Sequence, residues 1–97
     1  SEIERHCETD EVFILGQGKA VLYTESDHTF QMIDMELGVI YNVPKGTWHN
    51  LVATKDASLW IVENRDTHLH DTEIRTLEAI EKEQVRNLLP DWVSRAN

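Results

Sequence analysis

The chain has 97 residues, of which 40% are hydrophobic, so it is long enough for one folded domain with one core. Asp and Glu number 18 against 9 Lys and Arg, which gives a net charge of −9. Such a surface repels phosphate backbones and anionic lipids, so we expect neither nucleic-acid nor membrane binding. The single cysteine, Cys7, excludes an intrachain disulfide. With no signal-peptide pattern and no long apolar run, a soluble, cytoplasmic protein is expected.

Short strands separated by turns are predicted for most of the chain. Residues 11–24 (EVFILGQGKAVLYT) read as two apolar strands joined by a glycine turn. Residues 28–34 follow the next turn, and residues 39–43 form a strand that Pro44 ends, because proline lacks the N–H that a sheet requires. Two further strands are expected, at 47–52 and 58–63. This even spacing of turns favours an antiparallel sandwich or barrel.

The pattern changes after Glu63. Residues 64–73 (NRDTHLHDTE) are polar and read as a loop, in which we expect His68 and His70 to be solvated. Residues 77–92 then predict an amphipathic helix that ends near Pro90. The apolar residues of this helix are Leu77, Ile80, Val85, Leu88 and Trp92. The expected organisation is one domain, with a β-barrel over residues 1–70 and a helical extension over residues 71–97 packed on it.

A fixed arrangement of glycine, proline and histidine lies in the middle of the strand region. Gly38, Pro44, Gly46 and His49 have the spacing G-x5-P-x-G-x2-H. This pattern resembles the second sequence motif of the cupin superfamily, whose usual final Asn is replaced here by Ala53. Proline fixes φ at the end of a strand and glycine permits an unusual backbone twist, so this turn would aim His49 at the interior from a rigid support.

An earlier stretch is similar to the first cupin motif. His6, four residues, Glu11, six residues and Gly18 follow the motif, but Glu4 stands where the family usually has the first histidine of a pair. The resemblance covers about residues 4–63. It implies an all-β fold, namely a cupin-type double-stranded β-helix (jelly-roll) barrel with a C-terminal α-helix. It also implies a homodimer, since small cupins are commonly dimers.

The resemblance implies a metal site as well. Carried over position by position, it gives His6, Glu11 and His49 as ligands of one divalent ion (Mn, Fe, Ni or Zn), with Glu4 replacing a histidine ligand. Residues two apart on a strand share a face, so these four side chains can converge inside a closed sheet. Imidazole and carboxylate are both ligands of first-row metals. Glu4 could instead point outward, which would leave a three-ligand site or none.

Three functions remain open at this point. The first is a metal-dependent protein that binds a small polar molecule, with unknown catalytic residues and reaction type. The second is a metal-free binding module for a sugar or an organic acid, which Glu4 and Ala53 favour. The third is an interaction protein that uses its acidic surface and its helix. The simplest interpretations of single residues are a hydrogen-bonded core histidine for His49 and core packing for the aromatic side chains.

Overall fold

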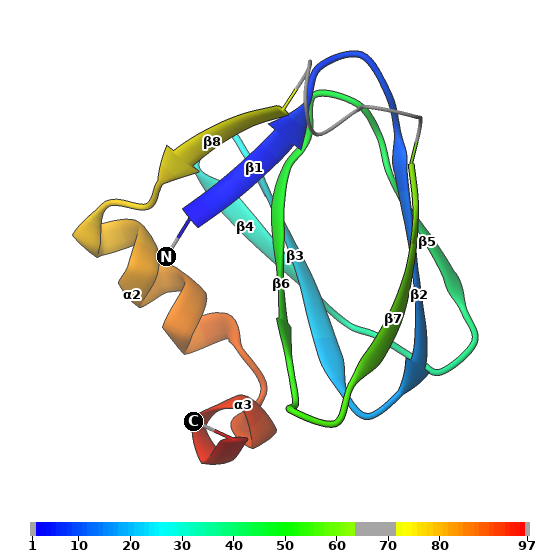
Figure 1. Ribbon diagram of the computed structural model, residues 1–97. Coiled ribbons are helices and arrows are strands. Elements are labelled where there is room, and N and C mark those ends of the chain that lie inside the picture. The colour runs from blue at the N-terminus through cyan, green and yellow to red at the C-terminus, as the bar shows by residue number, and fades with distance from the viewer. Residues whose placement is uncertain (1, 64–71, 97) are drawn as a thin grey trace.

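The computed structural model describes residues 2–63 and 72–96, and its strands form two antiparallel sheets that face each other (Figure 1). The first sheet has five strands in the order β4 (Thr29–Asp34), β3 (Ala20–Ser26), β6 (Trp48–Ala53), β1 (Glu2–His6) and β8 (Thr72–Thr76). The second has three strands in the order β5 (Ile40–Val43), β2 (Glu11–Gln17) and β7 (Ser58–Val62).

The space between the sheets holds the main hydrophobic core. On β2, Phe13 and Leu15 alternate with less buried neighbours and point to this space, as does Leu22 from β3. The buried members of this cluster are Phe13, Leu15, Ala20, Leu22, Met35 and Val43. Glu11 lies on the same face of β2 as Phe13, because residues two apart share a face. The pattern that builds the core therefore also brings a carboxylate into it.

The predicted all-β class is confirmed by this pair of sheets. The finer expectation, a cupin-type jelly-roll barrel, stays a prediction, because the described strands remain in two sheets that do not close into one. At one end the two sheets are connected by the turn between β5 and β6, which contains Gly46. This residue has a φ of 80°, and its N–H donates a hydrogen bond to the carbonyl oxygen of His6 at 2.6 Å.

Two helices follow the strands, α2 (Ala79–Leu88) and α3 (Asp91–Ala96). The first ends just before Pro90, as predicted, and packs against the outer face of the five-stranded sheet (Figure 1). Its contact forms a second core cluster of Ile3, Tyr23, Phe30, Leu77 and Val85. Two residues of the predicted apolar face, Ile80 and Leu88, are exposed instead. Within the described residues, neither helix is long and apolar enough to cross a membrane.

Strand β8 was not predicted. Its residues were divided between a loop and the helical extension, because Thr-Glu-Ile-Arg-Thr contains a single apolar residue. The strand forms through its pairing with β1, in which Ile3 lies opposite Arg75 and His6 opposite Thr72. Charged side chains support the pairing: Arg5 forms an ion pair with Glu73 at 2.8 Å. The sheet thus extends beyond the boundary expected at residue 70.

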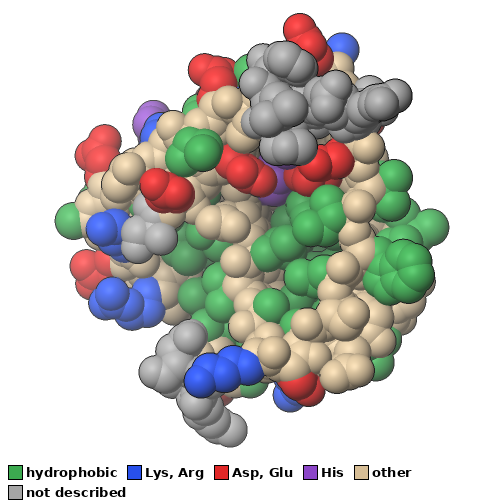
Figure 2. Space-filling view, in the orientation of Figure 1, with side chains coloured by type: hydrophobic (Ala, Val, Ile, Leu, Met, Phe, Trp, Pro, Cys, Tyr) green, Lys and Arg blue, Asp and Glu red, His purple; other side chains and the backbone are tan. Residues whose placement is uncertain are grey.

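The outer face of the three-stranded sheet is apolar although it is open to solvent. Cross-strand pairs place Ile14 between Ile40 and Trp60, and place Val12 next to Val62. Ile40 and Trp60 are 68% and 67% exposed, so the expectation that Trp60 belongs to the core is wrong. Figure 2 shows hydrophobic side chains gathered on this side of the molecule.

Candidate metal centre

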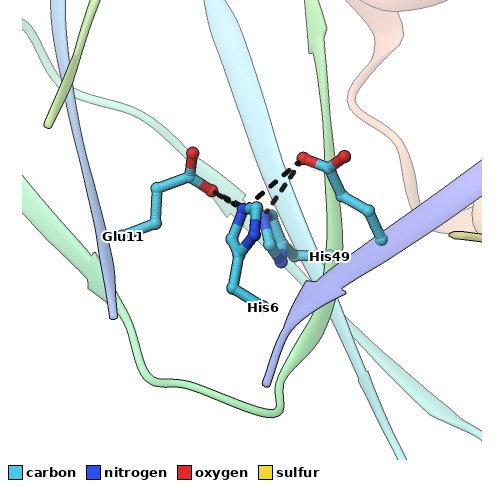
Figure 3. Close-up of side chains that lie close together, drawn as sticks. His6, Glu11 and His49 are labelled. Atoms are coloured by element: carbon cyan, nitrogen blue, oxygen red, sulfur yellow. Dashed lines mark hydrogen bonds and ion pairs between the residues drawn. The ribbon is translucent and has the colours of Figure 1, made fainter. Parts of the chain in front are cut away.

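Four titratable side chains meet in the space between the two sheets. Glu4 and His6 come from β1, Glu11 begins β2, and His49 lies on β6, where it pairs directly with Glu4. Figure 3 shows His6, Glu11 and His49 pointing toward one another from different strands. Each of the four offers one ligand atom, and these atoms all lie within 4.8 Å of one another. The structure therefore brings together the four residues that the sequence motifs singled out.

Glu11 lies at the centre of this cluster. Its Oε1 atom is 3.0 Å from Nε2 of His6 and 3.1 Å from Nε2 of His49. The Oε1 atom of Glu4 is 3.9 Å from each of the same two nitrogens. Ligands of one first-row metal ion lie about 2.0–2.2 Å from it, and hence about 3–4 Å from each other. The separations in the cluster match that range.

Both imidazole rings are held by their second nitrogen. The Nδ1–H of His49 donates to the carbonyl oxygen of Thr47 at 2.9 Å, since a carbonyl can only accept. The Nδ1 atom of His6 is 3.0 Å from the hydroxyl of Thr72. Partners of this kind fix the orientation of metal-binding histidines and keep Nε2 available to the ion. Strand β8, which supplies Thr72, is thus part of the support of the site.

The protonation of the cluster follows from its geometry. Burial by itself lowers the pKa of His49, but its contacts with Glu11 and Thr47 outweigh burial and leave the pKa above its ordinary value. Burial raises the pKa of Glu11, yet hydrogen bonds with His49 and Glu63 and the charge of the histidines bring the pKa below its ordinary value. Without an ion, the contact between Nε2 of His49 and Oε1 of Glu11 thus favours the protonated imidazole and the ionised carboxylate.

Burial differs within the cluster. His6, Glu11 and His49 are only 1–4% exposed. Ionisable side chains are seldom buried to this extent unless they are paired, as these three are with one another. The Glu4 side chain is 40% exposed and lies toward the opening between the sheets. Glu4 nevertheless points into the cluster, so the alternative in which it turns away is not what the structure shows. Glu4 is the ligand candidate that solvent or a small molecule can reach most easily.

Sequence reasoning missed one acidic residue. Oε2 of Glu63, the residue that follows β7, lies 4.0 Å from Nε2 of His6. Glu63 lies two residues after Ile61 and so continues the inner face of β7, which becomes clear only once the register of β7 against β2 is known. Ile61 is 52% exposed although its partner on β2 is the buried Phe13. Together these residues mark the open side of the cluster.

Of the other three histidines, His28 is among the described residues and lies outside this cluster. His28 is exposed in the β3–β4 turn, and the expected solvation of His68 and His70 concerns positions outside the described residues. Trp48 points to the face of β6 opposite His49 and lies against two guanidinium groups. The centroid of its ring is 4.6 Å from Cζ of Arg5 and 5.4 Å from Cζ of Arg75. It therefore packs on the helix-bearing side, away from the cluster.

No protein-family model and no curated protein matches this chain. The chemistry of the site therefore has to be judged from its own residues. Two imidazoles, one buried carboxylate and one accessible carboxylate form a donor set that fits a divalent first-row metal ion.

Proposed function

We propose that this protein binds one divalent metal ion between its sheets, through His6, Glu11, His49 and Glu4, and holds a small polar molecule beside it. The observation that carries the proposal is the contact of one carboxylate oxygen with two buried imidazole nitrogens at 3.0 and 3.1 Å. Both rings turn Nε2 toward the same point, and their Nδ1 atoms are engaged elsewhere. The donor set and the orientation of the rings support a metal centre at this point.

The position of the ligand follows from the open side of the cluster. Figure 2 shows hydrophobic side chains in a hollow between the sheets, with acidic side chains and a histidine at its upper end. Ile61 offers apolar surface there, while Glu4 and Glu63 supply carboxylates that are 40% and 28% exposed. These negative charges favour a neutral polar molecule over an organic anion. A bound metal ion acts as a Lewis acid toward a carbonyl or hydroxyl oxygen of such a molecule.

The metal content of the protein tests this proposal. The protein purified without chelator, or stripped and reloaded with Mn²⁺, Fe²⁺, Ni²⁺ or Zn²⁺ in turn, is expected to carry one equivalent of ion between its sheets. The measurement is elemental analysis after gel filtration, with the bound position located by anomalous scattering. An interior without an ion after all four reloading attempts would contradict the proposal.

A metal-free binding module is the second candidate. The direct contact between His49 and Glu11 favours it, because a proton on His49 satisfies both groups without an ion. The site would then bind its ligand through Glu4, Glu63 and the apolar surface of Ile61. The same elemental analysis separates the two functions, because this module would hold an organic molecule in the hollow and no metal.

We further propose that two copies of the chain associate through the apolar outer face of the three-stranded sheet. The side chains known to face outward there are Val12, Ile14, Ile40, Asn42, Trp60 and Val62, and none of them is charged. A patch without charge is where two molecules of net charge −9 repel each other least. Large exposed apolar faces commonly mark interfaces between proteins.

Replacement of Trp60 by Asp is expected to convert a dimer to a monomer, because it places a charge on this apolar face. Light scattering coupled to gel filtration measures the mass directly. Ile80→Asp, on the exposed face of α2, is the matched control and should leave the mass of the parent unchanged. A parent protein that is monomeric at high concentration would rule out this interface.

A further inference from the structure

A second group of metal-binding side chains lies on the other side of the five-stranded sheet. Glu25 stands near the end of β3, His28 lies in the β3–β4 turn, and Glu81 belongs to the first turn of α2. One carboxylate oxygen of each glutamate and one ring nitrogen of His28 lie within 4.8 Å of one another. These three residues are separate from the centre between the sheets and are not used by it.

Glu81 shows that this group is more than a cluster of surface charges. The residue is only 7% exposed. Its Oε1 atom accepts hydrogen bonds from the guanidinium of Arg75 at 2.7 Å and from the backbone N–H of Glu78 at 2.9 Å. Its Oε2 atom is buried and has no hydrogen-bond partner in the described part of the chain. Buried carboxylate oxygens are almost always paired, so this atom indicates a missing cation or donor.

The net charge of the groups around this oxygen favours a cation. Arg75 bridges the two carboxylates, since it also pairs with Oε2 of Glu25 at 2.8 Å. Its one positive charge faces two negative charges, so the group keeps a net negative charge when His28 is neutral. The described residues give no contact of 4.0 Å or less between His28 and either carboxylate, so the ring does not pair directly with Oε2 of Glu81.

We propose that Glu25, His28 and Glu81 form a second divalent-metal site that joins α2 to the β3–β4 turn. An imidazole nitrogen excludes Ca²⁺ and Mg²⁺ as the preferred ions, because these take oxygen ligands. A donor set of one nitrogen and two carboxylates suits Zn²⁺ with water in the remaining position. The ligand atoms of one zinc ion lie about 3.3 Å apart, so zinc binding would draw the exposed His28 ring and the two carboxylates closer than the 4.8 Å within which their ligand atoms now lie.

An ion at this site would attach the N-terminal turn of α2 more firmly to the five-stranded sheet. The helix α2 contacts β4 and contributes Val85 to the second core cluster, but its N-terminal turn is held to the sheet mainly through Glu81 and Arg75. An ion between Glu81 and the β3–β4 turn adds a second attachment there. Zinc binding at this site is therefore expected to stabilise the fold, since it binds the native state and not the unfolded chain.

His28→Gly tests the proposal with little risk to folding. His28 has a φ of 62°, which glycine adopts without strain, so the substitution removes the ring and preserves the turn. Asp27→Gly is the matched control, because Asp27 precedes it in the same turn, has a φ of 49° and is outside the group. The probe is Zn²⁺ alone, measured by calorimetric titration of the full chain and by the melting temperature with and without the ion.

The parent and Asp27→Gly are expected to bind one more equivalent of Zn²⁺ than His28→Gly. Zinc should also raise their melting temperatures by several degrees more than that of His28→Gly. Glu81→Gln should likewise lose the extra equivalent, because an amide is a poor zinc ligand. Equal zinc equivalents in His28→Gly and Asp27→Gly, with equal shifts of melting temperature, would show that the site does not exist.

Discussion

Replacement of His49 by alanine is expected to weaken metal binding between the sheets by about 100-fold or more. Loss of a residue that only supports a metal ligand commonly weakens binding by about 10–100-fold, and His49 is itself a ligand in the proposed centre. The substitution removes one of the two imidazoles that contact Oε1 of Glu11. The measurement is the dissociation constant for Mn²⁺ by titration, in a His28→Gly background so that the second proposed site does not contribute.

His49 is 1% exposed, so its removal also leaves a cavity, and the loss of metal could reflect a damaged fold. Glu11→Gln keeps the shape of the side chain and removes only its charge, and it should weaken binding to a similar extent. Thr72→Val, which removes the hydroxyl next to Nδ1 of His6, should weaken binding by a smaller factor of about 10. Unchanged affinity in both His49→Ala and Glu11→Gln would disprove the metal centre.

The pH dependence offers a further readout of the same interaction. In the metal-free protein the pKa of His49 is raised, so the ring keeps its proton up to a higher pH than an ordinary histidine does, and a metal ion has to displace that proton. The affinity for metal is therefore expected to fall as the pH decreases through the pKa of His49. This dependence should be weaker in His49→Ala, which carries no such proton.

Replacement of Phe13 by alanine is expected to lower the free energy of unfolding by about 3–5 kcal/mol. Phe13 is 3% exposed in the main core, and the substitution leaves a cavity that the two sheets cannot fill by small movements. The ring also lies edge-on to His49, with 5.8 Å between centroids. The loss of Phe13 therefore removes packing from both the core and the buried side of the candidate centre.

Chemical denaturation of the metal-free protein measures this effect without a contribution from metal binding. Ile40→Ala is the matched control, because it also removes a large apolar side chain from the three-stranded sheet but at a position that is 68% exposed. It should change the free energy of unfolding by less than about 0.5 kcal/mol in the monomer. Equal losses in the two variants would mean that the inner face of β2 is not the core.

The strands of the core could be predicted from the sequence because their signals are local. The apolar run of residues 12–15, the glycine turn that follows it and the stop at Pro44 depend only on neighbouring residues. The four candidate ligands were found because their spacing around two turns resembles known motifs. The structure adds that their ligand atoms lie within 4.8 Å of one another.

Features that depend on distant pairing could not be predicted in this way. Strand β8 has one apolar residue and exists because β1 lies beside it, so its own composition predicts a loop. Trp60 and Ile61 are adjacent and both apolar, so alternation could not indicate which one faces the core. Glu81 reads as a solvated helix residue, but the fold buries it and pairs it with Arg75 of β8, which its own sequence position does not indicate.

The position of β1 has a consequence for the order of folding. This strand carries two candidate ligands, yet it pairs only with segments that are remote in the sequence: Glu4 lies opposite His49, and His6 lies opposite Thr72. Contacts of such long sequence separation are slow to form and tend to form late. The metal ion would then bind only after β1 has paired with β6 and β8. Such an ion would slow unfolding and leave the folding rate almost unchanged.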